Sequence, residues 1–170
     1  MILRNLAKNG CIIPQVSLII SCLMQDMMNE QAKKTSILDT LVALVEHYPQ
    51  SVQEHDLQYI VLRELTDENP LLVLLTLRLF HACDSMHLKT IYPQILVSIH
   101  SLLNTSLLLY PEIIEEALEV IKKFHNSFDI QEFIDKSELV RFVNEIIRLL
   151  PKQSSRASKF LELIQAIQSR

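Results

Sequence analysis

The sequence predicts an all-α protein, and three observations lead to this fold class. The chain of 170 residues contains a single glycine, Gly10, whereas average usage would give about a dozen. Hairpin turns and phosphate-binding loops use glycine for positive φ, so few of them can exist here. Prolines recur at intervals of about 20 residues, and apolar residues between them follow a period near 3.6. These patterns favour helices joined by short turns over a sheet.

The first half of the chain carries capping signals for five helices. A helix over residues 2–9 stops at Asn9-Gly10, a second follows Pro14 to about residue 29, and a third covers about 35–47. The box Ser51-Val52-Gln53-Glu54 opens a fourth helix, because serine and glutamate satisfy each other's backbone amides.

The pair Asn69-Pro70 opens the fifth helix, a cap followed by proline at the first helical position. This helix, over 71–83, is apolar nearly all round. Such a helix is buried on most faces, so we expect it in the middle of the assembly.

The second half predicts further helices over 88–104, from Pro111 to about residue 124, over 137–150 and from Ser154 or Ser155 onward. The total is about eight helices with short connections, so residues 1–170 are expected to form one domain. The abrupt beginning inside a helix and the apolar last helix indicate a fragment of a longer chain, because solenoid ends normally carry polar capping repeats.

The proline spacing also indicates a repeat. Gaps of 21, 23 and 18 residues separate the prolines from 49 to 111, and 111 and 151 are 40 apart. Two helices thus make a unit of about 40 residues, the period of HEAT and armadillo arrays. The stretch 35–151 resembles three such hairpins, although the glycine typical of armadillo units and the Asp/Arg ladder of many HEAT units are absent. The resemblance implies a solenoid of stacked antiparallel hairpins that binds other proteins, and an irregular helical bundle is the alternative.

Composition argues against most enzymes and cofactors. One glycine excludes the Walker A, dinucleotide-binding and nucleophile-elbow motifs, each of which needs at least two. We therefore expect no catalytic residue, no cofactor and no metal. The segment containing His81, Cys83, Asp84 and His87 matches no standard zinc spacing and is better explained as a polar turn ending a helix.

Charge clusters supply the candidate partner-binding residues. From residue 136 onward seven basic and three acidic residues give a net charge of +4, so the first 135 residues carry −8 of the total of −4. Two sets are candidates, each with a solvated helix face as the alternative: the basic set Arg141, Arg148, Lys152, Arg156 and Lys159, and the glutamates Glu112, Glu115, Glu116 and Glu119.

The expected partner is another protein, bound as a peptide or helix in a groove between hairpins. Two alternatives are a nucleic-acid-associated domain using the basic C-terminal third, which the overall negative charge disfavours, and an obligate-oligomer bundle. Self-association through the terminal apolar helices is a related expectation.

The cellular setting is inferred from the cysteines and the apolar runs. Cys11, Cys22 and Cys83 are an odd number without paired spacing, which indicates buried thiols in a reducing, intracellular (cytoplasmic or nuclear) location. No apolar run is long enough for a membrane span.

Overall fold

A computed structural model of the chain describes residues 2–52, 63–102 and 110–127, together with the isolated residues 57, 140, 141, 143–145, 148, 162 and 165. Every regular element in these ranges is helical, which confirms the all-α prediction for the described part. The elements are α1 (Ile2–Lys8), α2 (Val16–Asn29), η1 (Gln31–Lys33), α3 (Lys34–His47), η2 (Pro49–Ser51), α5 (Pro70–Ala82), α6 (Ser85–Leu88), α7 (Tyr92–Leu102) and α8 (Pro111–Ser127).

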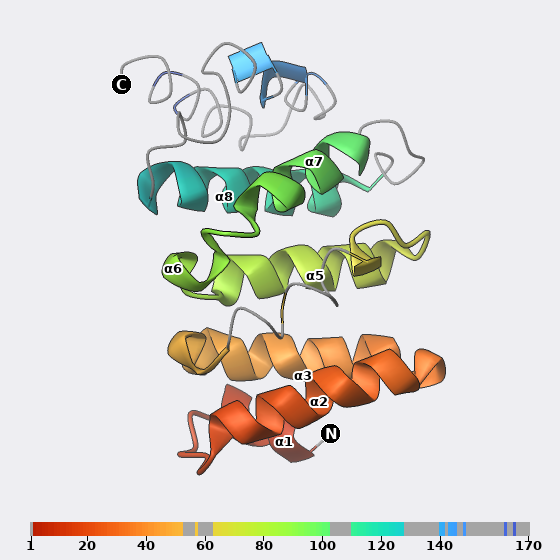
Figure 1. Cartoon of the computed structure of the whole chain (residues 1–170), viewed down its shortest axis with the longest axis vertical. Coiled ribbons are helices and arrows are strands. Elements are labelled where there is room, and N and C mark those ends of the chain that lie inside the picture. Colours follow the sequence, from red (N-terminus) through yellow and green to blue (C-terminus); the bar gives the residue numbers. More distant parts are fainter. Residues whose placement is uncertain are drawn as a thin grey trace.

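The helices lie in layers that follow the chain along the long axis of the molecule (Figure 1). Helices α1 and α2 form the first layer, α3 and α5 follow, and α7 and α8 lie beyond α5. The closest helix–helix packing connects α1 with α3, α3 with α5, and α5 with α8, while α2 packs on α3. Helices α1, α3, α5 and α8 therefore form one continuous row, which we call the helix row.

Hydrogen bonds at the helix ends show that the helix row is parallel. The hydroxyl of Tyr48, just after α3, donates to the carbonyl of Cys11 at 2.9 Å and accepts from the amide of Ile13 at 3.1 Å, both just after α1. The amide of Asp84, just after α5, donates to the carbonyl of Pro49, just after α3. Successive C-terminal ends therefore meet along one edge. Since α2 begins at this edge, it is antiparallel to α3.

Local sequence explains where the helices begin and end. Gly10 has φ +65° and follows α1 in a Schellman arrangement, in which the amides of Gly10 and Cys11 bond back to the carbonyls of Ala7 and Leu6. Asn69 caps α5 by accepting from the amide of Leu71 at 3.0 Å, with Pro70 at the first position. Both capping predictions are confirmed.

The core continues from layer to layer. Helix α5 buries Leu72, Val73, Leu75, Thr76, Leu77, Leu79 and Phe80 between α3 on one side and α8 on the other. This confirms the prediction that the apolar helix is central. Beyond it, the rings of Tyr92 on α7 and Phe124 on α8 stack with centroids 4.2 Å apart. One buried ion pair, Lys34 Nζ to Glu64 Oε1 at 2.6 Å, joins the start of α3 to the residues preceding α5.

One predicted boundary and one burial prediction are wrong. The helix expected over 88–104 is found as α7, but it begins at Tyr92 instead of residue 88, because Pro93 lacks an amide proton and fits only in the first turn of a helix. Of the three cysteines expected to be buried, only Cys83 is; Cys11 and Cys22 are exposed. Cys11 lies in a surface turn, and Cys22 lies on the side of α2 that faces away from α3. The predicted helix starting at the Ser51 box and those over 137–150 and after Ser154 or Ser155 lie largely outside the described residues.

Candidate functional site

A solvent-open cleft of about 320 Å³ lies on the helix row and is the candidate site. Its lining comes from three successive helices: Glu46 from α3, Arg78, His81 and Ala82 from α5, and Glu116 from α8. Arg78 and His81 are three residues apart, so they lie on the same face of α5. The parallel row places this face beside the C-terminal part of α3 and the first half of α8.

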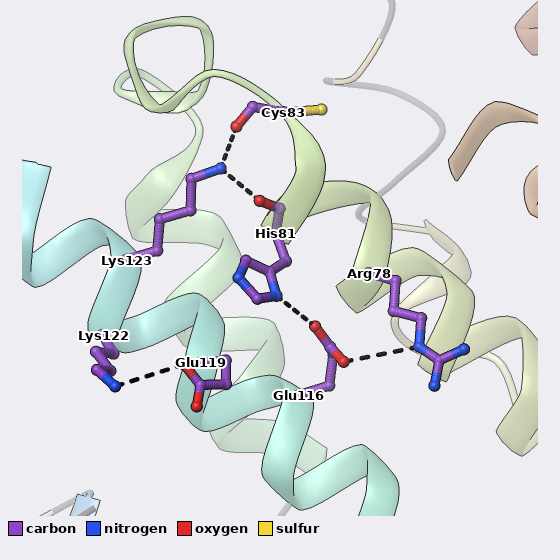
Figure 2. A network of polar contacts seen from close by, with 7 residues as sticks. All are labelled: Arg78, His81, Cys83, Glu116, Glu119, Lys122 and Lys123. Carbon is purple, nitrogen blue, oxygen red and sulfur yellow. Dashed lines mark hydrogen bonds and ion pairs between the residues drawn. The ribbon is translucent and has the colours of Figure 1, made fainter. Parts of the chain in front are cut away.

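Glu116 is the centre of the polar contacts in the cleft (Figure 2). Its Oε1 lies 2.7 Å from Nδ1 of His81, and its Oε2 lies 3.7 Å from Nε of Arg78. The Glu116 side chain is only 18% exposed, whereas those of Arg78 and His81 are nearly half exposed. One partly buried carboxylate thus holds two side chains of α5 against α8.

Glu46 forms the opposite wall of the cleft, is exposed and has no ion pair within the described residues. Together, Glu46 and Glu116 give the cleft two carboxylates, whereas Arg78 is its single guanidinium. An acidic wall open to water, with alternating charges beside it, is suited to a cationic side chain.

A lysine closes the C-terminal end of α5 beside the cleft. Lys123 of α8 donates to the carbonyls of His81 and Cys83, which are among the carbonyls left without helical partners at the end of α5 (Figure 2). Burial lowers the pKa of Lys123, and the neighbouring Cys83 and Asp84 oppose that shift. Burial raises the pKa of the Cys83 thiol to about 12, with Lys123 acting in the opposite direction. Cys83 is therefore a protonated, unreactive thiol at neutral pH.

The predicted glutamates all lie on α8 but differ in surroundings. Glu112 is exposed near the start of the helix, and Glu115, Glu116 and Glu119 are half-buried. Glu119 pairs with Lys122 one turn on, at 3.8 Å. Glu116 is the one member of the set that lines the cleft.

Only two residues of the predicted basic set belong to the described part of the chain. Arg141 and Arg148 are exposed, and Lys152, Arg156 and Lys159 lie outside the described residues. Neither Arg141 nor Arg148 lines the cleft, and the prediction for the whole set stays a prediction.

Sequence reasoning missed Glu46 and Arg78 as site residues and assigned His81 to a different cluster. A signal was present for α5, because Arg78 and His81 are the two exposed basic residues on an otherwise apolar helix. Glu46 had no comparable signal, since it meets the cleft only through the packing of α3 on α5.

Within the described residues, no group of three or more histidine, cysteine, aspartate or glutamate side chains is arranged to hold a metal ion. His81, from the segment that matched no standard zinc spacing, contacts Glu116. Among the described helices none combines the length and apolarity that a membrane span requires.

No protein family model, curated protein or solved structure matches the chain. The site must therefore be interpreted from its own geometry.

Proposed function

We propose that the protein is a non-enzymatic interaction module that binds a basic peptide or helix of a partner protein in the cleft formed by α3, α5 and α8. The observation that carries the proposal is the cleft itself, which is open to solvent and lined by charged residues from three successive helices. A surface built across layers offers more contact length than a single hairpin, as required for an extended or helical ligand.

The parallel helix row supports the solenoid part of the proposal. In an array of antiparallel hairpins, the second helix of each hairpin must run in the same direction as that of the next hairpin. Helices α3, α5 and α8 fit this order, and α2 supplies the antiparallel first helix for α3. We therefore propose a HEAT/armadillo-like stack in which α1 belongs to the same row.

The charge of the cleft supports a basic ligand. A lysine or arginine entering beside Glu46 would gain a carboxylate that has no ion pair within the described residues, and would approach Glu116 without displacing His81. Exposed ion pairs contribute only about 0.2–1 kcal/mol each, so affinity must also come from apolar contacts along the row. Charge then selects the partner more than it strengthens binding.

We further propose an intracellular location for this module. The thiols of Cys11 and Cys22 are exposed and Cys83 is buried, and all three are free. Exposed free thiols are retained most readily in a reducing compartment.

The test is affinity capture of partners from lysate, read by mass spectrometry, with the intact chain and two charge-reversal variants. Glu46→Lys alters the cleft without breaking an ion pair in the described part, so folding should be retained. Glu68→Lys is the matched control, because Glu68 is also exposed but lies in the turn before α5. We expect a defined protein to be captured by the intact chain and the control, and lost with Glu46→Lys.

A third variant separates this proposal from its main alternative. Reversing Arg148, Lys152 and Arg156 to glutamate tests the basic C-terminal third. If only this variant loses the captured protein, the cleft is not the site. If only nucleic acid is recovered, with steep loss on adding salt, the interaction-module proposal fails.

A further inference from the structure

Exposed apolar side chains gather on the first layer of the molecule. Of the nine large apolar residues that are exposed in the described part, five lie between residues 2 and 28: Ile2, Leu6, Ile12, Leu18 and Met28. Ile12 is 93% exposed and Leu18 is 61% exposed. This layer packs on α3 through its opposite side, and among the described helices no further layer covers these five side chains.

Helix α2 has an outer face with the spacing of a helix–helix seam. Val16, Ile20, Met24 and Met27 are buried and define the inner face. At 100° per residue, the opposite face consists of Leu18, Cys22, Gln25 and Asn29, all exposed and spaced by four, three and four residues. None of the four is charged. Over residues 10–29 the only charged side chain is Asp26, whereas a helix that stays in water normally carries several charges.

The few charges around this face are arranged so that a twofold rotation would bring opposite charges of two copies together. At the end where α2 begins, the exposed Lys8 is the one charged residue in the segment 5–25. At the end where α2 stops, Lys33 pairs with Glu30 at 2.5 Å and also interacts with Asp26, so these three residues carry one net negative charge. One end is therefore positive and the other negative. Two copies of α2 placed antiparallel bring Lys8 of each copy to the Asp26 end of the other.

We propose that this outer face of α2 is a self-association surface, where two copies of the chain pair through antiparallel α2 helices about a twofold axis. The apolar register places Leu18 of each copy against Cys22 of the other, so the twofold axis crosses α2 at the level of residue 20 on its outer face. Ser21 borders this contact, and its small size lets the two helices approach closely. The same patch serves both copies, as an isologous contact requires.

The size of the surface sets the expected strength of the pairing. Stable interfaces bury about 1,200–2,000 Å² in total, whereas the proposed seam consists mainly of one 14-residue helix from each copy. The association is therefore expected to be reversible and to depend on protein concentration. None of the four residues of this outer face lines the cleft, so we expect the pairing to be independent of the proposed partner binding.

Sedimentation equilibrium of the full chain under reducing conditions, over a hundredfold range of concentration, tests the proposal. We expect the mass to double toward high concentration. Leu18→Glu introduces a carboxylate into each half of the seam and should weaken dimerisation at least tenfold. Val97→Glu is the matched control, because Val97 is 69% exposed on α7, and it should leave dimerisation unchanged. Circular dichroism verifies that both variants retain their helical content.

Cross-linking then tests the register. In a Cys11→Ser background, a short bismaleimide should join two chains through Cys22 and give a covalent dimer that Leu18→Glu abolishes. The proposal is overturned if the chain stays monomeric at all concentrations, or if it dimerises equally well with Leu18→Glu. A dimer that forms but resists cross-linking at Cys22 refutes the antiparallel register. None of these outcomes bears on capture by the cleft.

Discussion

Alkaline pH is expected to destabilise the folded protein through the buried thiol of Cys83. This thiol is fully buried at the end of α5, and burial raises its pKa from 9.0 to about 12. Above pH 9 the unfolded chain loses the proton while the folded chain keeps it, so stability present below pH 9 is lost as the pH rises toward 12. At pH 10, one unit above the unfolded pKa, the loss is about 1.4 kcal/mol.

Comparison with Cys83→Ala isolates this contribution. The variant loses one buried sulfur, which costs about 1 kcal/mol of unfolding free energy at every pH. It no longer has a thiol to titrate, so the part of the alkaline loss caused by Cys83 disappears. Two other groups with shifted pKa values, Lys123 and Tyr92, are present in both proteins. Burial lowers the pKa of Lys123, which changes the stability with pH in the opposite direction, and burial raises the pKa of Tyr92. The variant should therefore be less stable than the parent at pH 7 and about equally stable at pH 10.

The assay is urea unfolding at pH 7, 9 and 10, followed by circular dichroism at the helical band in the presence of a reductant. Cys22→Ala provides the control, because Cys22 is exposed and its removal should leave the pH dependence unchanged. The reasoning is refuted if Cys83→Ala loses as much free energy of unfolding between pH 7 and pH 10 as the parent does. It is also refuted if the Cys22 variant flattens the profile instead.

The remaining predictions concern stability and use the same urea assay at pH 7. Asn69→Ala removes the cap of α5 and should cost about 1 kcal/mol. Lys34→Met leaves the carboxylate of Glu64 buried without its cation and should cost about 3–5 kcal/mol, much of which the double variant with Glu64→Leu should recover. Phe124→Ala opens the core where the ring stacks on Tyr92, and should cost about 3–5 kcal/mol, against less than 1.5 kcal/mol for Phe124→Leu if the core repacks. Equal costs for the single and double variants, or for Ala and Leu at position 124, would contradict these assignments.

Helix positions were largely predictable because their signals are local. Gly10 ends α1 through its positive φ, and Asn69 with Pro70 begins α5 through a cap and a preset backbone angle. These effects act within one turn of helix, so the sequence contains them directly. The central position of α5 was also predictable, because a helix that is apolar nearly all round must be covered on most sides.

The site was harder to predict because its contacts join distant parts of the chain. Glu116 meets His81 across 35 residues, and Lys123 reaches the carbonyl of Cys83 across 40. Spacing along α8 identified the glutamates as one group, but only the packing of α8 on α5 selects Glu116. The exposure of Cys22 was missed for a different reason, because cysteine is usually buried. The apolar stripe of Val16, Ile20 and Met27 does place Cys22 on the opposite face of α2.

The central place of α5 has a consequence for how the protein can be divided. A fragment that ends before α8 would expose one apolar side of α5, and a fragment that begins after α3 would expose the other. Either cut would create a large apolar patch of the kind that drives aggregation. Limited proteolysis should therefore yield no soluble piece that contains α5 without both α3 and α8.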